Sequence, residues 1–410
     1  METWVDVPIG LDAERWVTRR GCRVVLVMVH TLACGQRLLD VVALLRSDMR
    51  VQVVFTPAPS AFSAGVEEFL AQLGGVVLPW EQAVRMRFDL ALAANTGGIE
   101  NVHAPVVLLP HGAGFNKFIA TAATGSAAAP RETFGLGRQW LVRDGRVLPS
   151  VLVLAHENER RRLAQACPEA VPAAVVAGDP CFDRLRLSLD SREEYRHALG
   201  VGRDERLVVA ASTWGASSLL GARADVMARL VREAATTTTR AALLVHPNVW
   251  MGHGTWQVKA WLADWAAAGL LVVPVEEEWR AVLAAADAVV GDHGSATLYA
   301  ALTGQPVMLA SGGGADVDPH SPMGELLRSS PQLPDSGQVL SLVERVSAGW
   351  NAQRLAGVAS RITSAPGEFA TRMRAALYRV LEMPEPATPA RTDRVEPPRV
   401  AVPRPTRTEA

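Results

Sequence analysis

Three histidines close apolar runs of the sequence, and they are the side chains best suited to move protons or to meet a phosphate. His111 lies in LLPHGAGFNKF, His246 in LLVHPNVW and His293 in VVGDHGSATLYAALTG. An imidazole titrates near neutral pH, so it can accept a proton from an attacking hydroxyl or donate a hydrogen bond to a charged oxygen. His111 is predicted to be a general base, and His246 is predicted to stabilise charge that develops on a pyrophosphate. A packed histidine is the alternative for each.

The segment after the apolar run DAVVGD opens a helix and predicts a phosphate-binding loop. Glycine allows a tight turn there, and the following amides lie at the positive end of the helix, where a phosphate is stabilised. We expect these amides to face a diphosphate. A helix cap, which any α/β protein needs, is the alternative. The predicted donor-binding residues in this loop are Asp292, His293, Gly294, Ser295, Ala296 and Thr297.

Two further groups of small and polar residues flank these histidines. Ser212 and Thr213, in STWGASS, offer hydroxyls to a second phosphate region of the donor site. Gly112 and Gly114 follow His111 and let a substrate approach the backbone closely. With Lys117, which could pair with a phosphate or be solvated, they are predicted to form the acceptor side.

These residues need strands and helices to position them. Apolar runs such as RVVLVMVHT and APVVLLP alternate with helix-like stretches, which predicts parallel sheets wound by βαβ units. We expect an α/β fold with two Rossmann-like domains facing across a cleft, with ligands beyond the carboxyl ends of the strands. The predicted division is an acceptor domain at 1–170, a connection at 171–203 with a turn at AGDP, a donor domain at 204–366, a helix at 367–383 that returns to the N-terminal domain, and a disordered tail at 384–410.

Composition excludes several classes of protein. The 410 residues are 49% apolar and carry a formal net charge of −1, so no global field would hold the chain on nucleic acid. The four cysteines lack metal-binding spacing, and no metal is predicted. No run approaches the roughly 18 apolar residues of a membrane span. We expect a cytoplasmic protein with peripheral contact at the inner membrane face as an option, and the oligomeric state stays open.

Taken in order, HGAGFNK, AGDPCFDRL, STWG, VHPNV and DAVVGDHGSATLYAALTGQPVML resemble the motifs of the CDP-glycerol glycerophosphotransferase family over roughly residues 105 to 310. More distantly, the layout is similar to the GT-B glycosyltransferases and the UDP-N-acetylglucosamine 2-epimerases. The resemblance implies a transferase that uses a CDP- or UDP-activated donor and a hydroxyl acceptor without a cofactor. It also implies that His111 activates the acceptor, that His246 lies near the donor pyrophosphate, and that Asp292 and Ser295 belong to the donor-phosphate loop.

The sequence also departs from that family. Pro110 replaces its tryptophan, Ala113 and Gly114 replace its Thr-Pro, and Gly294 with Ser295 replaces its paired serines. A glycosyl group and a polyol-phosphate group therefore both stay open as the group transferred.

Four other functions are alternatives to the transferase. An esterase would need G-x-S-x-G downstream of HGAG, and a nicotinamide-dependent oxidoreductase would need G-x-G-x-x-G after the first strand; the sequence has neither. A nucleotide-sugar epimerase and a non-catalytic nucleotide-ligand-binding or interaction protein on the same scaffold stay open.

Overall fold

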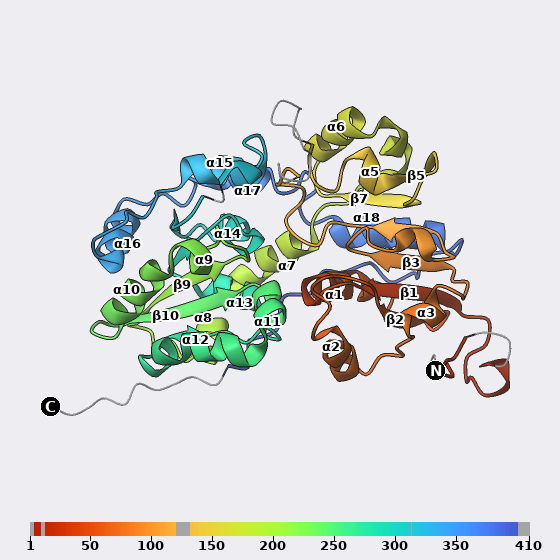
Figure 1. Cartoon of the computed structure of the whole chain (residues 1–410), viewed down its shortest axis with the longest axis horizontal. Helices are drawn as coiled ribbons and strands as arrows, with labels where there is room; N and C mark the ends of the chain where they lie inside the picture. Colours follow the sequence, from red (N-terminus) through yellow and green to blue (C-terminus); the bar gives the residue numbers. More distant parts are fainter. Residues whose placement is uncertain (1–3, 10–12, 120–131, 313, 401–410) are drawn as a thin grey trace. The chain divides into compact units, whose positions relative to one another are not determined.

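The computed structural model describes residues 4–9, 13–119, 132–312 and 314–400 of the chain. The chain divides into two compact units, and each combines helices with a parallel sheet (Figure 1). Unit 1 comprises Met1–Phe115, Thr121–Pro180 and Thr363–Thr392, and unit 2 comprises Asn116–Ala120, Cys181–Ile362 and Asp393–Ala410. The α/β class and the two Rossmann-like units predicted from the sequence are confirmed.

Unit 1 is built on a parallel sheet of six strands in the order β2-β1-β3-β4-β7-β8. The strands are β1 (Arg23–Val29), β2 (Val51–Pro57), β3 (Leu90–Ala93), β4 (Val106–Leu108), β7 (Val151–Leu154) and β8 (Ala174–Val176). The chain builds outward from β1 to β2 and then returns to add β3 on the other side. This reversal makes the carboxyl ends of β1 and β3 the topological switch point of the unit, where ligands bind in open α/β sheets.

The helices of unit 1 cover a sheet whose central strands are buried on both faces, as in other parallel sheets. One of them comes from the far end of the chain: Figure 1 shows α18, in blue, beside strands drawn in red and orange. Its Phe369, Met373 and Leu377 belong to the same apolar cluster as Val25 and Val27 of β1. The elements are η1 (Ala13–Arg15), α1 (Leu32–Val42), α2 (Val66–Leu73), α3 (Trp80–Ala83), η2 (Ile99–Asn101), α5 (Arg138–Leu141), a hairpin of β5 (Val142–Arg143) and β6 (Arg146–Val147), α6 (Glu157–Ala166), η3 (Pro168–Ala173) and α18 (Phe369–Val380).

Unit 2 holds a parallel sheet of five strands in the order β11-β10-β9-β12-β13, so its switch point lies at the carboxyl ends of β9 and β12. The strands are β9 (Arg206–Ser212), β10 (Thr239–Val245), β11 (Leu271–Val272), β12 (Ala288–Gly291) and β13 (Val307–Leu309). The helices are α7 (Pro180–Ser188), η4 (Leu189–Ser191), α8 (Arg192–Ala198), α9 (Leu219–Ala222), α10 (Ala224–Ala234), α11 (Pro247–His253), α12 (Thr255–Ala267), α13 (Trp279–Ala285), α14 (Ser295–Ala300), η5 (Gly314–Asp316), α15 (Pro322–Ser329), α16 (Val339–Ala348) and α17 (Ala356–Ser360). Among the residues that the structure describes, no helix has the length and hydrophobicity needed to cross a bilayer.

The units do not follow the division expected from the sequence at every point. The stretch 171–203, expected to be a connection, is shared out: β8 and Asp179 belong to unit 1, and the chain from Cys181 belongs to unit 2. Residues 116–119 belong to unit 2 although they follow β4 of unit 1. A short segment therefore leaves unit 1 just after the His111 loop and joins the other unit.

The tail also differs from the expectation of disorder over 384–410. Val395 is fully buried, its amide donates to Ser188 Oγ at 2.9 Å, and its carbonyl accepts from the Tyr195 hydroxyl at 2.8 Å. The proline-rich composition has no apolar periodicity, but one valine and its main chain find partners on α7 and α8. The disorder prediction is wrong for 384–400, and 401–410 lie outside the described residues.

Candidate functional site

The switch point of unit 2 is organised by one buried carboxylate. Asp292 follows β12, and its Oδ2 accepts from the amides of Thr213 at 2.9 Å and Leu219 at 2.7 Å, while its Oδ1 accepts from the amide of Gly294 at 2.9 Å. Burial raises the pKa of Asp292, although the three amides and the charge of Lys117 oppose that rise. The side chain therefore ties the ends of β9 and β12 to the start of α9.

This arrangement revises the predicted phosphate loop. The Gly294 amide is used by Asp292, so it does not face a ligand. The Thr297 hydroxyl is buried and accepts from the Asp292 amide at 3.2 Å, so it fixes the loop as well. Gly294 has an ordinary φ of −82°. A glycine is needed because a Cβ at this position would lie 2.9 Å from the Thr213 side chain.

His246 lies beside the same switch point, at the end of β10. Its amide donates to the Ser212 carbonyl at 3.0 Å, and its Nδ1 accepts from the Asn248 amide at 3.0 Å, which caps α11. Because Nδ1 accepts a hydrogen bond, the proton of the neutral ring is on Nε2. The Ser212 hydroxyl accepts from the amide of Leu220 at 3.1 Å and is buried. His246 is half-buried, and its ring is held in one orientation.

Lys117 and His293 lie close enough in unit 2 for the charge of Lys117 to act on the imidazole. The segment 116–119 is fixed there, because the Phe118 amide donates to the Asp316 carbonyl and the Asp318 amide donates to the Asn116 carbonyl, both at 2.9 Å. Burial lowers the pKa of Lys117, and the charges of Asp292 and Asp316 oppose this. Burial and the charge of Lys117 together lower the pKa of His293 to about 4. Lys117 was predicted to belong to the acceptor side, and the structure places it with the donor loop.

In unit 1, His111 is an exposed residue in a loop after β4 that is otherwise partly or fully buried, and Arg37 holds the backbone of this loop. Arg37 of α1 donates from Nε to the Pro110 carbonyl at 3.0 Å and from Nη2 to the Gly112 carbonyl. The same guanidinium forms an ion pair with Asp179 at 2.7 Å, and the two side chains are only 3% and 1% exposed. Asp179 of the AGDP turn therefore fixes the Arg37 guanidinium, and Arg37 in turn fixes the backbone of the His111 loop.

A second buried charge holds the other end of this loop. Glu159 of α6 accepts from the amides of Phe115 at 3.2 Å and Ala155 at 2.8 Å, and burial raises its pKa. Gly114 has a φ of +73°, and a Cβ there would lie 2.2 Å from Glu159 Oε1. Gly114 therefore has to be glycine for two reasons, its left-handed backbone and the close carboxylate. Arg162 donates to the Phe115 carbonyl at 2.8 Å.

Sequence reasoning did not find Arg37, Glu159 or Arg162. Asp179 was placed in a linker turn. The predicted residues form two groups: Ser212, Thr213, His246 and 292–297 come together in unit 2 with Lys117, while His111, Gly112 and Gly114 share one loop of unit 1. One sequence signal could have pointed to Arg37: it is a charged residue among the apolar residues of α1 (LACGQRLLDVV).

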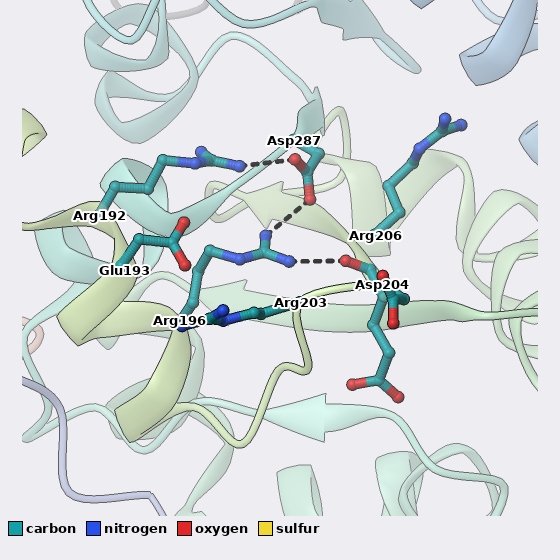
Figure 2. A pocket seen from close by; sticks show the side chains of 8 residues that line it. Arg192, Glu193, Arg196, Arg203, Asp204, Arg206 and Asp287 are labelled. Atoms are coloured by element: carbon teal, nitrogen blue, oxygen red, sulfur yellow. Dashed lines mark hydrogen bonds and ion pairs between the residues drawn. The ribbon is translucent and has the colours of Figure 1, made fainter.

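A surface pocket of about 390 Å³ opens at the opposite, amino edge of the unit 2 sheet (Figure 2). Figure 2 shows Arg192 and Arg196 turned toward Asp287, at 2.6 and 2.8 Å. The lining holds four arginines and four carboxylates, so its charges compensate one another. We assign this pocket a structural role, because it ties α8 to the start of β9 and β12. Over the described ranges, no group of three or more His, Cys, Asp or Glu could hold a metal ion.

Comparison with known proteins places the fold. Its fold resembles that of the wall teichoic acid polymerase TagF. A TagF variant structure has a TM-score of 0.57 at 10% identity, covering 88% of this chain and 90% of that chain. A TagF variant soaked with CDPG gives a TM-score of 0.58 at 9% identity, with the same coverages of 88% and 90%. Anabaena HepE in complex with UDP-glucose gives a TM-score of 0.48 at 15% identity and covers 88% of this chain and 98% of that chain.

The TagF likeness confirms the predicted resemblance at the level of the fold. No protein-family model matches the sequence. No curated protein matches it either.

Proposed function

We propose that this chain is a transferase that moves a glycosyl or polyol-phosphate group from a CDP- or UDP-activated donor to a hydroxyl acceptor. The observation that carries the proposal is the switch point of unit 2. There Asp292 fixes the ends of β9 and β12, and His246 presents a ring of fixed tautomer on the next strand. The shared fold with TagF, of which two structures were soaked with CDPG, supports it.

The donor binds in unit 2 and the acceptor in unit 1. His111 accepts the proton of the acceptor hydroxyl, and the hydroxyl oxygen attacks the anomeric carbon of a sugar donor or the phosphorus of a polyol-phosphate donor. The bond to the nucleotide breaks, and a nucleoside diphosphate or monophosphate leaves. The Nε2–H of His246 donates to the leaving phosphate, whose charge grows as the bond breaks. Gly112 and Gly114 border the acceptor, and Ser295 and Ala296 border the donor phosphates.

Asp292, Thr213, Gly294 and Thr297 act by shaping the donor loop, because their polar groups bond to one another. Ser212 acts in the same way through α9. Arg37 and Glu159 position the His111 loop in unit 1. The reaction uses no cofactor beyond the donor. The protein works in the cytoplasm, where such donors are available, with peripheral contact at the inner membrane face.

The test is release of nucleotide from a panel of CDP- and UDP-activated donors offered with hydroxyl acceptors. The wild-type protein is expected to release nucleotide from one donor class. His111→Ala is expected to lower kcat by about 10² to 10⁴ while donor affinity is kept, as for loss of a general base. Donor binding without turnover would overturn the transferase and favour a non-catalytic binding protein. Interconversion of donor sugars without transfer would identify an epimerase.

A further inference from the structure

Among the described residues, two side chains near the donor loop of unit 2 lack hydrogen-bond partners at a nitrogen atom, and they differ in burial. Lys117 is partly buried, and within the described part of the chain its ammonium makes no hydrogen bond or ion pair. His293 is only 6% exposed, and its Nδ1 has no hydrogen-bond partner. A buried polar atom and a partly desolvated charge both cost free energy unless they are paired, so an anionic ligand that meets both groups would be stabilised by them.

The acidic residues near Lys117 do not satisfy it. Asp292 acts on its charge, but both oxygens of that carboxylate accept from backbone amides. The charge of Asp316 also acts on Lys117 and on His293, and it raises the pKa of both. The two carboxylates therefore favour the charged form of Lys117, and its ammonium can still bind an anionic ligand. A neutral imidazole beside it can donate from Nδ1 if the proton is on that nitrogen.

The backbone on which Lys117 lies is fixed to unit 2 by hydrogen bonds. The chain leaves unit 1 after Phe115, and Lys117 forms an isolated antiparallel bridge with Val317. Asn116 Oδ1 also accepts from the Met323 amide at 3.3 Å, which fixes the segment to the start of α15. A solvated surface lysine needs no such support. The segment delivers one cation to the donor loop of unit 2.

We propose that Lys117 and His293 form a subsite for the diphosphate of a nucleoside diphosphate ligand in unit 2. Lysine meets phosphate as a compact point charge, and a buried imidazole N–H adds direction. This deepens the proposed function, on which it rests for the identity of the nucleotide as a donor. It moves Lys117 from the acceptor side, where the sequence placed it, to the donor side. It also gives His293 a defined ligand atom.

The test uses the scarcity of lysine, because Lys117 and Lys259 are the only two in the chain. The full-length protein is acetylated with and without UDP, CDP or inorganic pyrophosphate, and modification of each lysine is followed by mass spectrometry. Nucleoside diphosphate is expected to protect Lys117 and to leave Lys259, exposed on α12, unchanged. Equal modification of Lys117 with and without saturating nucleotide would overturn the subsite.

Calorimetric titration of UDP and CDP gives the second readout. Lys117→Met is expected to weaken binding by about ten- to a hundredfold, the value of one charge-assisted hydrogen bond, and Lys259→Met to leave it unchanged. His293→Asn is expected to weaken binding less. The Lys117→Met protein is expected to unfold at the same or higher urea concentration, since a partly desolvated cation is removed. Unchanged affinity in Lys117→Met would overturn the subsite.

These results separate the subsite from the transferase. Protection of Lys117 in a protein that turns over no donor would support the subsite and remove the transferase. Normal turnover and affinity in Lys117→Met would keep the transferase and remove the subsite. A wild-type protein that binds no nucleoside diphosphate would overturn both.

Discussion

The carboxyl edges of the two sheets treat buried charge differently. In unit 1, Arg37 and Asp179 pair with each other, and Arg37 and Glu159 also bond to the backbone on either side of the His111 loop. In unit 2, Asp292 is satisfied in the same way, but over the described residues the ammonium of the partly buried Lys117 makes no hydrogen bond or ion pair. The buried Nδ1 of His293 has no hydrogen-bond partner, but neither does the buried Nδ1 of His30 after β1 of unit 1, so the contrast between the units rests on Lys117. A partly buried cation without a partner favours an anionic ligand. We therefore assign the diphosphate to unit 2 and a positioned but solvent-facing base to unit 1.

A second comparison, between two histidines that cap helices, shows that this local geometry does not identify a catalytic residue. His156 and His246 each end a strand of a sheet, and each accepts on Nδ1 from the amide two residues later, at 2.9 and 3.0 Å. Both cap a helix, so the local geometry alone gives neither a role in catalysis. The difference is position. His246 follows β10, beside the switch-point strand β9, whereas His156 follows β7, which is two strands from β3.

The largest expected effects concern the satisfied charges. Asp292→Ala would leave the amides of Thr213, Leu219 and Gly294 without their acceptor, and each buried unsatisfied donor costs about 1 to 3 kcal/mol. We expect the free energy of unfolding of unit 2 to fall by about 3 kcal/mol or more, measured by urea denaturation. Asp190→Ala, on the outer turn η4, is the control and should change little. A loss below about 1 kcal/mol would show that Asp292 does not organise the switch point.

Arg37→Met tests the same idea in unit 1. It removes the arginine partner of the buried Asp179, and breaking a buried pair costs about 3 to 5 kcal/mol. The double variant Arg37→Met with Asp179→Leu should recover part of this, because both charges are gone. Urea denaturation of both single variants and the double variant gives the coupling energy. Additive losses would contradict the pairing.

The two capping histidines offer a matched pair of smaller effects. His156→Ala and His246→Ala should each lower the free energy of unfolding by about 0.5 to 2 kcal/mol, as for loss of a helix cap. Only His246→Ala should also reduce kcat for the donor that the wild-type protein uses. Equal activity in the two variants would remove His246 from the reaction. Both denaturation curves and initial rates are needed.

A further effect is a pH dependence of stability from His293. Its folded pKa of about 4 lies below the ordinary value of 6.5, so folding favours the neutral ring. The stability it contributes is complete above pH 6.5 and is lost as the pH falls toward 4, with a slope of up to about 1.4 kcal/mol per pH unit. Urea denaturation between pH 4 and 7 should show a flatter profile for His293→Gln. An unchanged profile would mean that the ring is not buried as a neutral group.

The sequence predicts the winding of both sheets, because buried parallel strands read as apolar runs that end in polar residues. It also predicts the edge where His246 and Asp292 lie. It does not predict the Arg37–Asp179 pair, whose partners are 142 residues apart, since nothing local marks a side chain that bonds across the fold. It placed Lys117 with its sequence neighbours, although the chain changes units at Asn116. Within 384–400, single residues such as the buried Val395 make the contacts, and a prediction based on the average composition of the segment does not detect them.

A crystal structure of the full chain with UDP or CDP tests the central assignment most directly. We expect the β-phosphate at the switch point of unit 2, within hydrogen-bonding distance of the Lys117 ammonium and the His293 ring. Density for the nucleotide at the arginine pocket of Figure 2, or at the His111 loop of unit 1, would contradict it.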